Sequence, residues 1–145
     1  MLQKLFPNLI EYFDEFLISL SETFQMMIIA GSITIIIGLI TGVLIVVTKP
    51  KGIMENRLAH QIFDKITNLI WSIPFIILYM TLYPLVSYLF KQNALKVTGA
   101  ILPLVIGAVP FFVRQVENAL SEVDQGIIEA AVSMGISNFQ IITRV

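Results

Sequence analysis

The fold is decided by residues 24–47, FQMMIIAGSITIIIGLITGVLIVV, a run of 24 residues without a charged side chain. About 20 apolar helical residues are enough to cross a bilayer core about 30 Å thick. Two further uncharged runs follow, at residues 66–90 and 97–113. A chain of 145 residues is too short to bury three such helices in a water-soluble core. The runs therefore predict an all-α, polytopic membrane protein.

The overall composition leads to the same class. Hydrophobic side chains make up 57% of the chain and charged ones 13%, and the mean hydropathy is +0.86. A soluble domain carries about 25% charged residues, enough to cover a surface that faces water. The net charge of −1 offers no basic field, so we expect no nucleic-acid partner. The absence of cysteine excludes disulfides and thiolate metal sites.

We expect one transmembrane domain over residues 1–145, with three spans at residues 24–47, 66–90 and 95–116. The third uncharged run is short for a bilayer, so this span continues past Arg114, whose long side chain can snorkel to the interface. Residues 1–22 place apolar and acidic side chains on opposite faces of a helix. They predict an amphipathic helix that lies along the interface or packs against the bundle.

The basic residues predict the orientation in the membrane. With three spans, the loop after the first span shares a side with everything after the third. That side carries Lys49, Lys51, Arg57, Lys65, Arg114 and Arg144, and the other side carries Lys4, Lys91 and Lys96. Because cytoplasmic loops carry the excess of lysine and arginine, the amino terminus is expected outside and the carboxyl terminus in the cytoplasm.

The sequence lacks the residues that catalysis would need. His60 is the one histidine, so it has no second histidine or cysteine for a metal site or a nucleophile–base pair, and we expect it to be an ordinary loop or interface side chain. A P-loop is also absent, so the chain cannot bind ATP in that way. The three uncharged runs carry no proton-relay residue, which disfavours a proton-coupled carrier. No catalytic residue, metal or cofactor is expected.

Small residues recur along one face of the first span. Ala30, Thr34, Gly38 and Gly42 follow one another at four-residue steps, and the last two form a GxxxG pair. Small side chains let helix backbones approach closely where lipid provides no hydrophobic drive for association. This face is therefore predicted to pack against another helix.

Four prolines interrupt the later spans. Pro74 and Pro84 lie in the second span, and Pro103 and Pro110 in the third. Each removes a backbone donor, so each is predicted to kink its helix. Repeated kinks suit a moving pathway, but proline is also more frequent in membrane helices in general, and both interpretations stay open.

The segment at residues 126–145 predicts two short helices joined by a turn. The first is expected from Ile127 to Met134, with Gly135 at positive φ just past its end and Glu129 in its first turn. Ser137 and Gln140 fit the capping box that begins the second. Ala130 and Ala131 give the first helix a face with small side chains. Another protein could approach this face closely, or the face could pack on the chain's own bundle.

Glu129-Ala130-Ala131-x-x-x-Gly135 resembles the EAA loop of ABC importer permeases. Flanking motifs are similar to those of the methionine importer permeases within that family, and the resemblance covers about residues 20–145. These motifs are Thr48-Lys49-Pro50, SIPFIIL at residues 72–78, Pro103-Leu104, GAVPF at residues 107–111 and VENAL at residues 116–120.

The resemblance implies a permease subunit of the cytoplasmic membrane that moves an amino acid, methionine before others, by alternating access. It makes residues 126–145 the coupling segment. The residues that contact the ATPase would be Glu129, Ala130, Ala131, Met134 and Gly135. The implied partners are a second permease copy, a dimer of cytoplasmic ABC ATPase subunits that bind the ATP and magnesium, and an extracytoplasmic substrate-binding lipoprotein.

In the family, the EAA motif continues to a Leu-Pro pair and to further membrane helices, whereas this sequence stops at Val145. We therefore expect an incomplete permease, either a fragment or a truncated gene product. Two alternatives stay open: a permease for another amino acid, and a membrane scaffold fragment without a transport role. A membrane-embedded enzyme lacks any candidate site.

Overall fold

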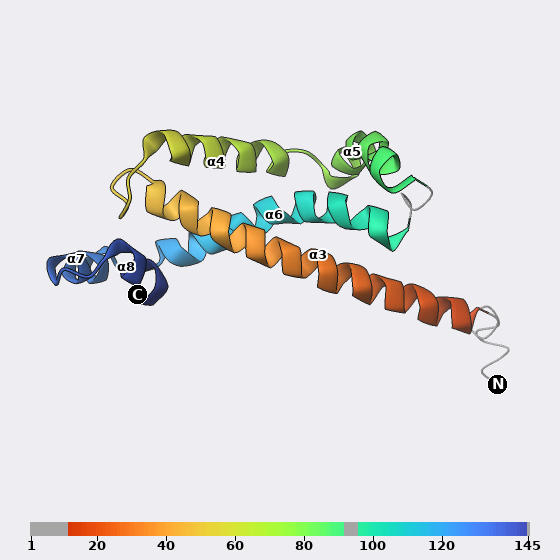
Figure 1. Cartoon of the computed structure of the whole chain (residues 1–145), viewed down its shortest axis with the longest axis horizontal. Coiled ribbons are helices and arrows are strands. Elements are labelled where there is room, and N and C mark those ends of the chain that lie inside the picture. The colour runs from red at the N-terminus through yellow and green to blue at the C-terminus, as the bar shows by residue number, and fades with distance from the viewer. Residues whose placement is uncertain (1–11, 92–95, 145) are drawn as a thin grey trace.

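The computed structural model describes residues 12–91 and 96–144 (Figure 1). Its helices are α3 (Phe13–Thr48), α4 (Arg57–Trp71), α5 (Phe75–Phe90), α6 (Val97–Ser121), α7 (Gln125–Ser133) and α8 (Asn138–Arg144). The described residues contain no strand, and the predicted all-α class is confirmed.

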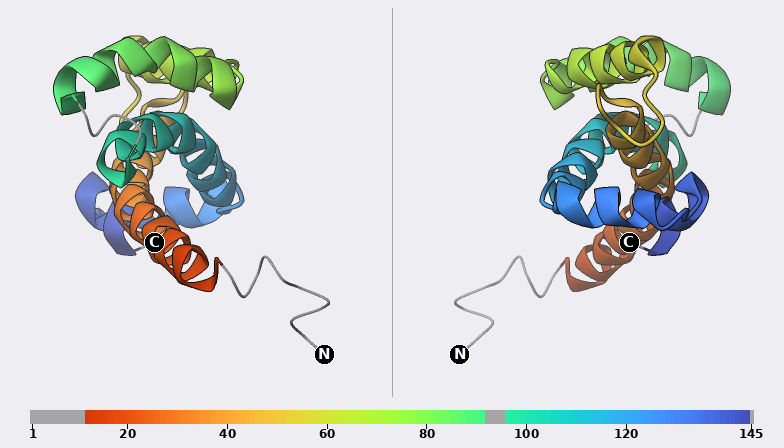
Figure 2. Two further views of the ribbon diagram at one scale, coloured as in Figure 1. Left: turned by 90° about the vertical axis from the view of Figure 1, so that its right-hand side faces the viewer. Right: turned by 90° about the vertical axis from the view of Figure 1, so that its left-hand side faces the viewer.

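The helices pass along the long axis of the molecule three times. α3 runs along most of the length, α4 returns beside it and leads to α5 at the far end, and α6 runs back in the direction of α3 (Figure 1). The α7–α8 hairpin therefore lies at the end where α3 stops and α4 begins. This arrangement brings the loop at residues 49–56 and the hairpin to the same end of the molecule (Figures 1 and 2).

α3 and α6 are each long and apolar enough to cross a membrane. α4 and α5 meet the same criterion only as a pair, and they are bent by 101° at the break between them. The described residues thus contain two helices that could span a membrane, or three spans if the bent pair counts as one. The second span was expected over residues 66–90, but its first helix already begins at Arg57.

Pro74 produces the break between α4 and α5. Proline has no N–H and disfavours the helical conformation of the residue before it, so α4 ends at Trp71 and α5 begins at Phe75. The hydroxyl of Ser72 donates to the carbonyl of Asn68 at 2.7 Å and closes the end of α4. The predicted kink is therefore a complete interruption of the helix.

The helices α5 and α6 continue through the other three prolines. Pro84 lies inside α5, and Pro103 and Pro110 lie inside α6, where both are buried. Seen along the molecule, α6 is curved (Figure 2). These prolines therefore shape continuous helices and do not end them.

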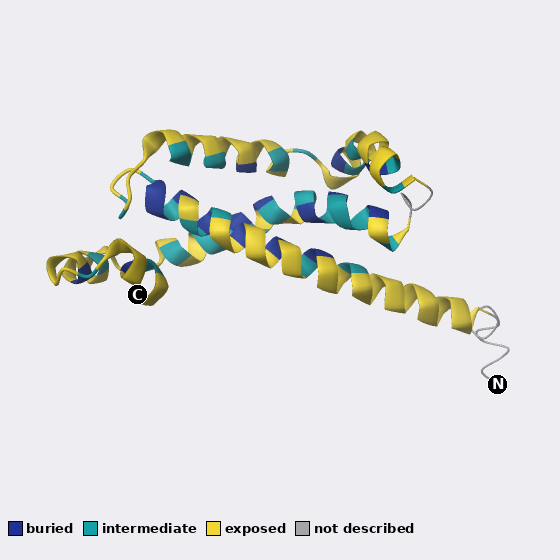
Figure 3. Ribbon diagram, in the orientation of Figure 1, coloured by how far each residue is buried: buried dark blue, intermediate teal, exposed yellow. Residues whose placement is uncertain are grey.

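α3 differs from the expectation at its amino-terminal end. Residues 13–22 are the first turns of the same helix that contains the first span, so in this part there is no separate amphipathic helix. No glycine or proline interrupts the chain between Phe13 and Ala30, which lets the helix propagate without a break. Its outer turns are exposed and project beyond α6 (Figure 3). Residues 1–11 of the expected amphipathic helix lie outside the described residues.

The small-residue face of α3 packs against α6. Ala30, Thr34, Gly38 and Gly42 are all buried. A Cβ built on Gly38 would lie 2.7 Å from Cδ1 of Phe112, and one built on Gly42 would lie 2.7 Å from Cβ of Val116. Because no methyl group fits at either position, the glycines set the distance between the two helix backbones.

The hydroxyl of Thr34 is buried in this face without a hydrogen-bond partner among the residues that the structure describes. A buried polar group left unpaired costs about 1–3 kcal/mol. Thr34→Val keeps the shape and removes the hydroxyl, so it is expected to raise the melting temperature of the detergent-solubilised protein. Thr48→Val is the matched control, because the buried Thr48 hydroxyl donates to the carbonyl of Leu44 at 2.5 Å. That variant should melt lower, and a lower melting temperature for Thr34→Val would contradict the prediction.

The last carbonyl groups of α3 are paired with polar groups of the chain that follows it. Nδ1 of His60 lies 3.0 Å from the carbonyl oxygen of Ile45. The carbonyls of Val46, Val47 and Thr48 accept from the N–H groups of Lys49, Met54 and Asn56, respectively. All four carbonyls that a helix end leaves without an intrahelical partner are thereby satisfied. His60 thus helps to hold the start of α4 against the end of α3.

Candidate coupling site

The α7–α8 hairpin begins at a capped helix end. The Asp124 carboxylate accepts a hydrogen bond from the N–H of Gly126 at 2.7 Å, so α7 begins at Gln125, two residues earlier than expected. Glu129 therefore lies in the second turn of α7, and its predicted place in the first turn is wrong. Glu129 is exposed, and it lies beyond the first turn, where the helix terminus stabilises a carboxylate most.

Gly135 makes the turn between the two helices. Its φ is +75°, as predicted. The N–H of Gly135 donates to the carbonyl of Val132 at 2.9 Å, and the N–H of Ile136 donates to that of Ala131 at 3.2 Å. These two bonds form a Schellman motif, which needs the left-handed conformation at the glycine. The direction in which α8 leaves α7 therefore depends on this residue.

The predicted capping box begins α8. The N–H of Ser137 donates to Oε1 of Gln140 at 3.3 Å, and the N–H of Gln140 donates to Oγ of Ser137 at 3.4 Å. In addition, the amide of Asn138 donates to the carbonyl of Ile53 at 3.4 Å. This bond ties the hairpin to the loop between α3 and α4.

Four of the five residues that the resemblance assigned to the ATPase contact are exposed. These are Glu129, Ala130, Met134 and Gly135. Ala131 differs, because its side chain is only 3% exposed. It is one of the buried residues of the hairpin, together with Ile141 of α8. A small side chain at this position therefore serves the packing of the hairpin, and the direct contact expected for Ala131 does not fit this geometry.

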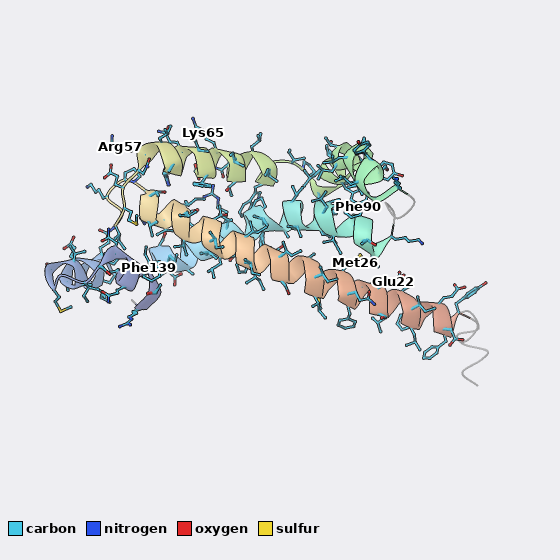
Figure 4. The ribbon with its side chains drawn as sticks, viewed as in Figure 1. Glu22, Met26, Arg57, Lys65, Phe90 and Phe139 are labelled. Carbon is cyan, nitrogen blue, oxygen red and sulfur yellow. The ribbon has the colours of Figure 1, made fainter. Side chains whose placement is uncertain are left out.

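Three apolar side chains that the sequence analysis did not single out complete the surface. Ile127, Val132 and Phe139 are 55%, 53% and 75% exposed, and Met134 is 72% exposed. Phe139 lies on the hairpin near its junction with the rest of the molecule (Figure 4). The signal in the sequence was the number of apolar side chains, which exceeds what two short helices can bury. We call these four residues, with Glu129, Ala130 and Gly135, the hairpin surface.

A cleft of about 580 Å³ separates α7 from the end of α3. Lys49 and Lys51 line it from the loop after α3, and Glu129 lines it from α7. Glu55 lies in the same loop. Its carboxylate accepts hydrogen bonds from the backbone N–H of Lys51 and from the guanidinium of Arg57, and these bonds, in that order of size, hold the pKa of the Glu55 carboxyl below its ordinary value. The charged loop and the hairpin thus face each other across an open space.

Arg114 joins α6 to α4. One of its Nη atoms lies 2.6 Å from the Asp64 carboxylate and 2.6 Å from the amide oxygen of Asn68, and the other pairs with Glu117. Its side chain is 16% exposed. α6 continues past Arg114 as expected, and partners on α4 and on its own helix hold the guanidinium in place. We call these four residues the Arg114 cluster.

These features define a polytopic membrane subunit with a helical hairpin at one end. Among the described residues, no group of three or more histidine, cysteine, aspartate or glutamate side chains is placed to hold a metal ion. The chain belongs to the family of binding-protein-dependent transport system inner membrane components, whose sequence profile matches residues 36–145. The match includes the end of α3, the broken pair, α6 and the hairpin.

Individual relatives agree with this family. The chain is 44% identical over 127 residues to the "Probable D-methionine transport system permease protein MetI" of Pasteurella multocida, an alignment that covers 88% of this chain and 58% of that protein. It is 40% identical over 124 residues to the "D-methionine transport system permease protein MetI" of Escherichia coli K12, covering 86% and 57%.

The fold is also found in solved structures. A chain of the MetNI methionine ABC transporter, crystallised in inward-facing conformations, superimposes with a TM-score of 0.78 at 38% identity. The match covers 86% of this chain and 57% of that one. The chain thus spans a little more than half the length of the relatives that it matches.

Proposed function

We propose that this chain forms the membrane-spanning permease part of an ATP-driven methionine importer. The observation that carries the proposal is the hairpin surface, which presents exposed apolar side chains around the Glu-Ala-Ala and glycine motif. Sequence identity to proteins named as D-methionine permeases supports the substrate class. These 145 residues contain no P-loop, and the energy is proposed to come from an ATPase on a separate subunit.

The hairpin surface is proposed as the docking site for that ATPase. Apolar side chains rarely stay in contact with water over a contiguous patch unless another protein covers them. Met134 and Phe139 are the large exposed side chains on either side of Gly135, and they are suited to enter a cleft on a partner. Glu129 and Ala130 complete the contact. Gly135 acts by setting the angle between the two helices.

The rest of the assembly follows from the same proposal. Two permease copies pair around a central path, two ATPases bind on the cytoplasmic side, and an extracytoplasmic lipoprotein delivers the amino acid. The excess of lysine and arginine at the end that carries the hairpin supports a cytoplasmic position for that end. Closure of the ATPase dimer then moves the hairpins, and the helices rock between outward- and inward-open states.

Reconstitution tests the proposal. The protein is co-expressed with the candidate ABC ATPase, and the complex is purified through a tag on the membrane subunit and placed in lipid vesicles with the binding protein. The expected result is co-purification of the ATPase and ATP-dependent accumulation of labelled methionine. Accumulation of another amino acid in place of methionine would support the alternative substrate. Failure of the ATPase to co-purify would overturn the proposal and leave a membrane scaffold.

A further inference from the structure

The Arg114 cluster occupies a junction between two moving parts of the proposed transporter. α6 carries Arg114 and leads through the short connection at residues 122–124 to α7. α4 carries Asp64 and Asn68 and leads to the break at Pro74 and then to α5. The cluster therefore connects the helix that bears the hairpin to the helix pair that is bent by 101°.

The same stretch of α6 is held on its other side by α3. Val113 and Val116 pack over Gly42 at distances that leave no room for a methyl group, while Arg114 reaches Asp64 on α4. Near the cluster, α4 and α6 also make an aromatic contact, with the rings of Trp71 and Phe111 centred 6.1 Å apart. Apolar contacts of this kind allow helices to slide past one another by small amounts.

The polar contact behaves differently. Charge-assisted hydrogen bonds from a guanidinium have a defined direction, and they weaken steeply when the helices shift. Asp64 also accepts from the amide of Asn68 at 3.2 Å, so the two acceptors on α4 are oriented by each other. Separating α4 from α6 would leave the largely covered Arg114 guanidinium without its partners on α4, which is unfavourable. The cluster therefore resists sliding that the surrounding contacts permit.

We propose that Arg114 is a positioning residue that fixes α4 to α6, so that a displacement of the hairpin reaches the break between α4 and α5. The role in transport rests on the proposed function. The mechanical connection is a property of the helices alone. Two experiments therefore test separately whether Arg114 fixes α4 to α6 and whether transport depends on that connection.

The first experiment measures the distance between α4 and α6. The chain contains no cysteine, so Lys65→Cys with Ser121→Cys gives two exposed sites for spin labels on an unmodified background. In lipid nanodiscs, a narrow distance distribution is expected, unchanged when the ATPase and a non-hydrolysable ATP analogue are added. Arg114→Gln should broaden it. An unaltered distribution in Arg114→Gln, or a wild-type distance that changes on ATP binding, would overturn the proposal.

The second experiment measures methionine taken up per ATP hydrolysed in the reconstituted complex. Loss of a charged hydrogen bond is expected to lower this ratio about tenfold in Arg114→Gln, while ATPase binding and ATP hydrolysis persist. The double variant Asp64→Asn with Arg114→Gln should recover part of the loss, because the Asp64 carboxylate is then no longer left without its partner, while Glu117 is unchanged in both variants. Arg57→Gln is the control: its guanidinium is exposed, pairs with Glu55 and points away from α6 (Figure 4).

A wild-type ratio in Arg114→Gln would overturn the role of the cluster. A complex that takes up no methionine even with the unaltered chain would instead count against the proposed function. In that case the spin-label distances still decide whether Arg114 fixes α4 to α6.

Discussion

Gly135→Val is expected to abolish methionine uptake and to leave the protein inserted in the membrane. Gly135 has φ of +75°, a conformation that costs a residue with a side chain about 1–3 kcal/mol, and a β-branched residue most of all. The effect is purely one of the backbone, because a Cβ at this position would meet no atom within 4 Å. The strain is relieved when the Schellman turn opens. α8 then leaves α7 in another direction and carries Phe139 away from Met134.

Uptake into vesicles and co-purification of the ATPase measure this effect, and membrane fractionation verifies insertion. Gly135→Asn is the matched control, because asparagine tolerates positive φ better than other residues with a side chain. It should keep much of the uptake, and Gly135→Ala should fall between the two. Wild-type uptake by the valine variant would show that the hairpin angle does not matter.

Gly42→Val is expected to have the largest effect on stability. A Cβ on Gly42 would lie 2.7 Å from Cβ of Val116 and 3.2 Å from the carbonyl oxygen of Val113. The second contact is with backbone, so a side-chain rotation cannot relieve it, and α3 and α6 must separate. Overpacking of this kind costs about 1–3 kcal/mol or more. At Gly38 the nearest atoms belong to the Phe112 side chain, which can move, so the same substitution there should cost less.

Thermal unfolding of the detergent-solubilised protein measures the loss, and a fall in melting temperature of about 5 °C or more is expected. Gly31→Val introduces the same residue into the same helix at a position where a Cβ meets nothing within 4 Å. It should change the melting temperature little. If the two variants melted alike, helix propensity and not the contact with α6 would explain the result.

Much of the fold was accessible from the sequence because its signals are local. Uncharged runs long enough to cross a bilayer predicted α3 and α6, and Pro74 predicted a kink at the position where the structure separates α4 from α5. Four-residue steps of small residues predicted the face of α3 that packs on α6. The positive φ of Gly135 and the capping box of Ser137 were predictable because a few neighbouring residues determine them.

The features that the sequence did not predict are those that depend on residues far apart in the chain. The partners of Arg114 were not predicted, because Asp64 and Asn68 lie 50 and 46 positions earlier in the chain. Ala131 was expected on the contact surface, but it is buried, while Phe139 is exposed. Which face of a short helix is covered depends on how the helix is docked, and that docking is made by contacts such as Asn138 with Ile53.

The sequence alone determined that this protein is helical, lies in a membrane and carries the glycine-ended motif of its family. Periodicity, apolar length and backbone conformation act over a few residues, and so they can be read along the chain. Only the tertiary structure decided how sharply the second span bends, which hairpin side chains face outward, and that Arg114 ties α6 to α4. These features depend on side chains that come into contact only after the helices have packed, and no local pattern in the sequence predicts such contacts.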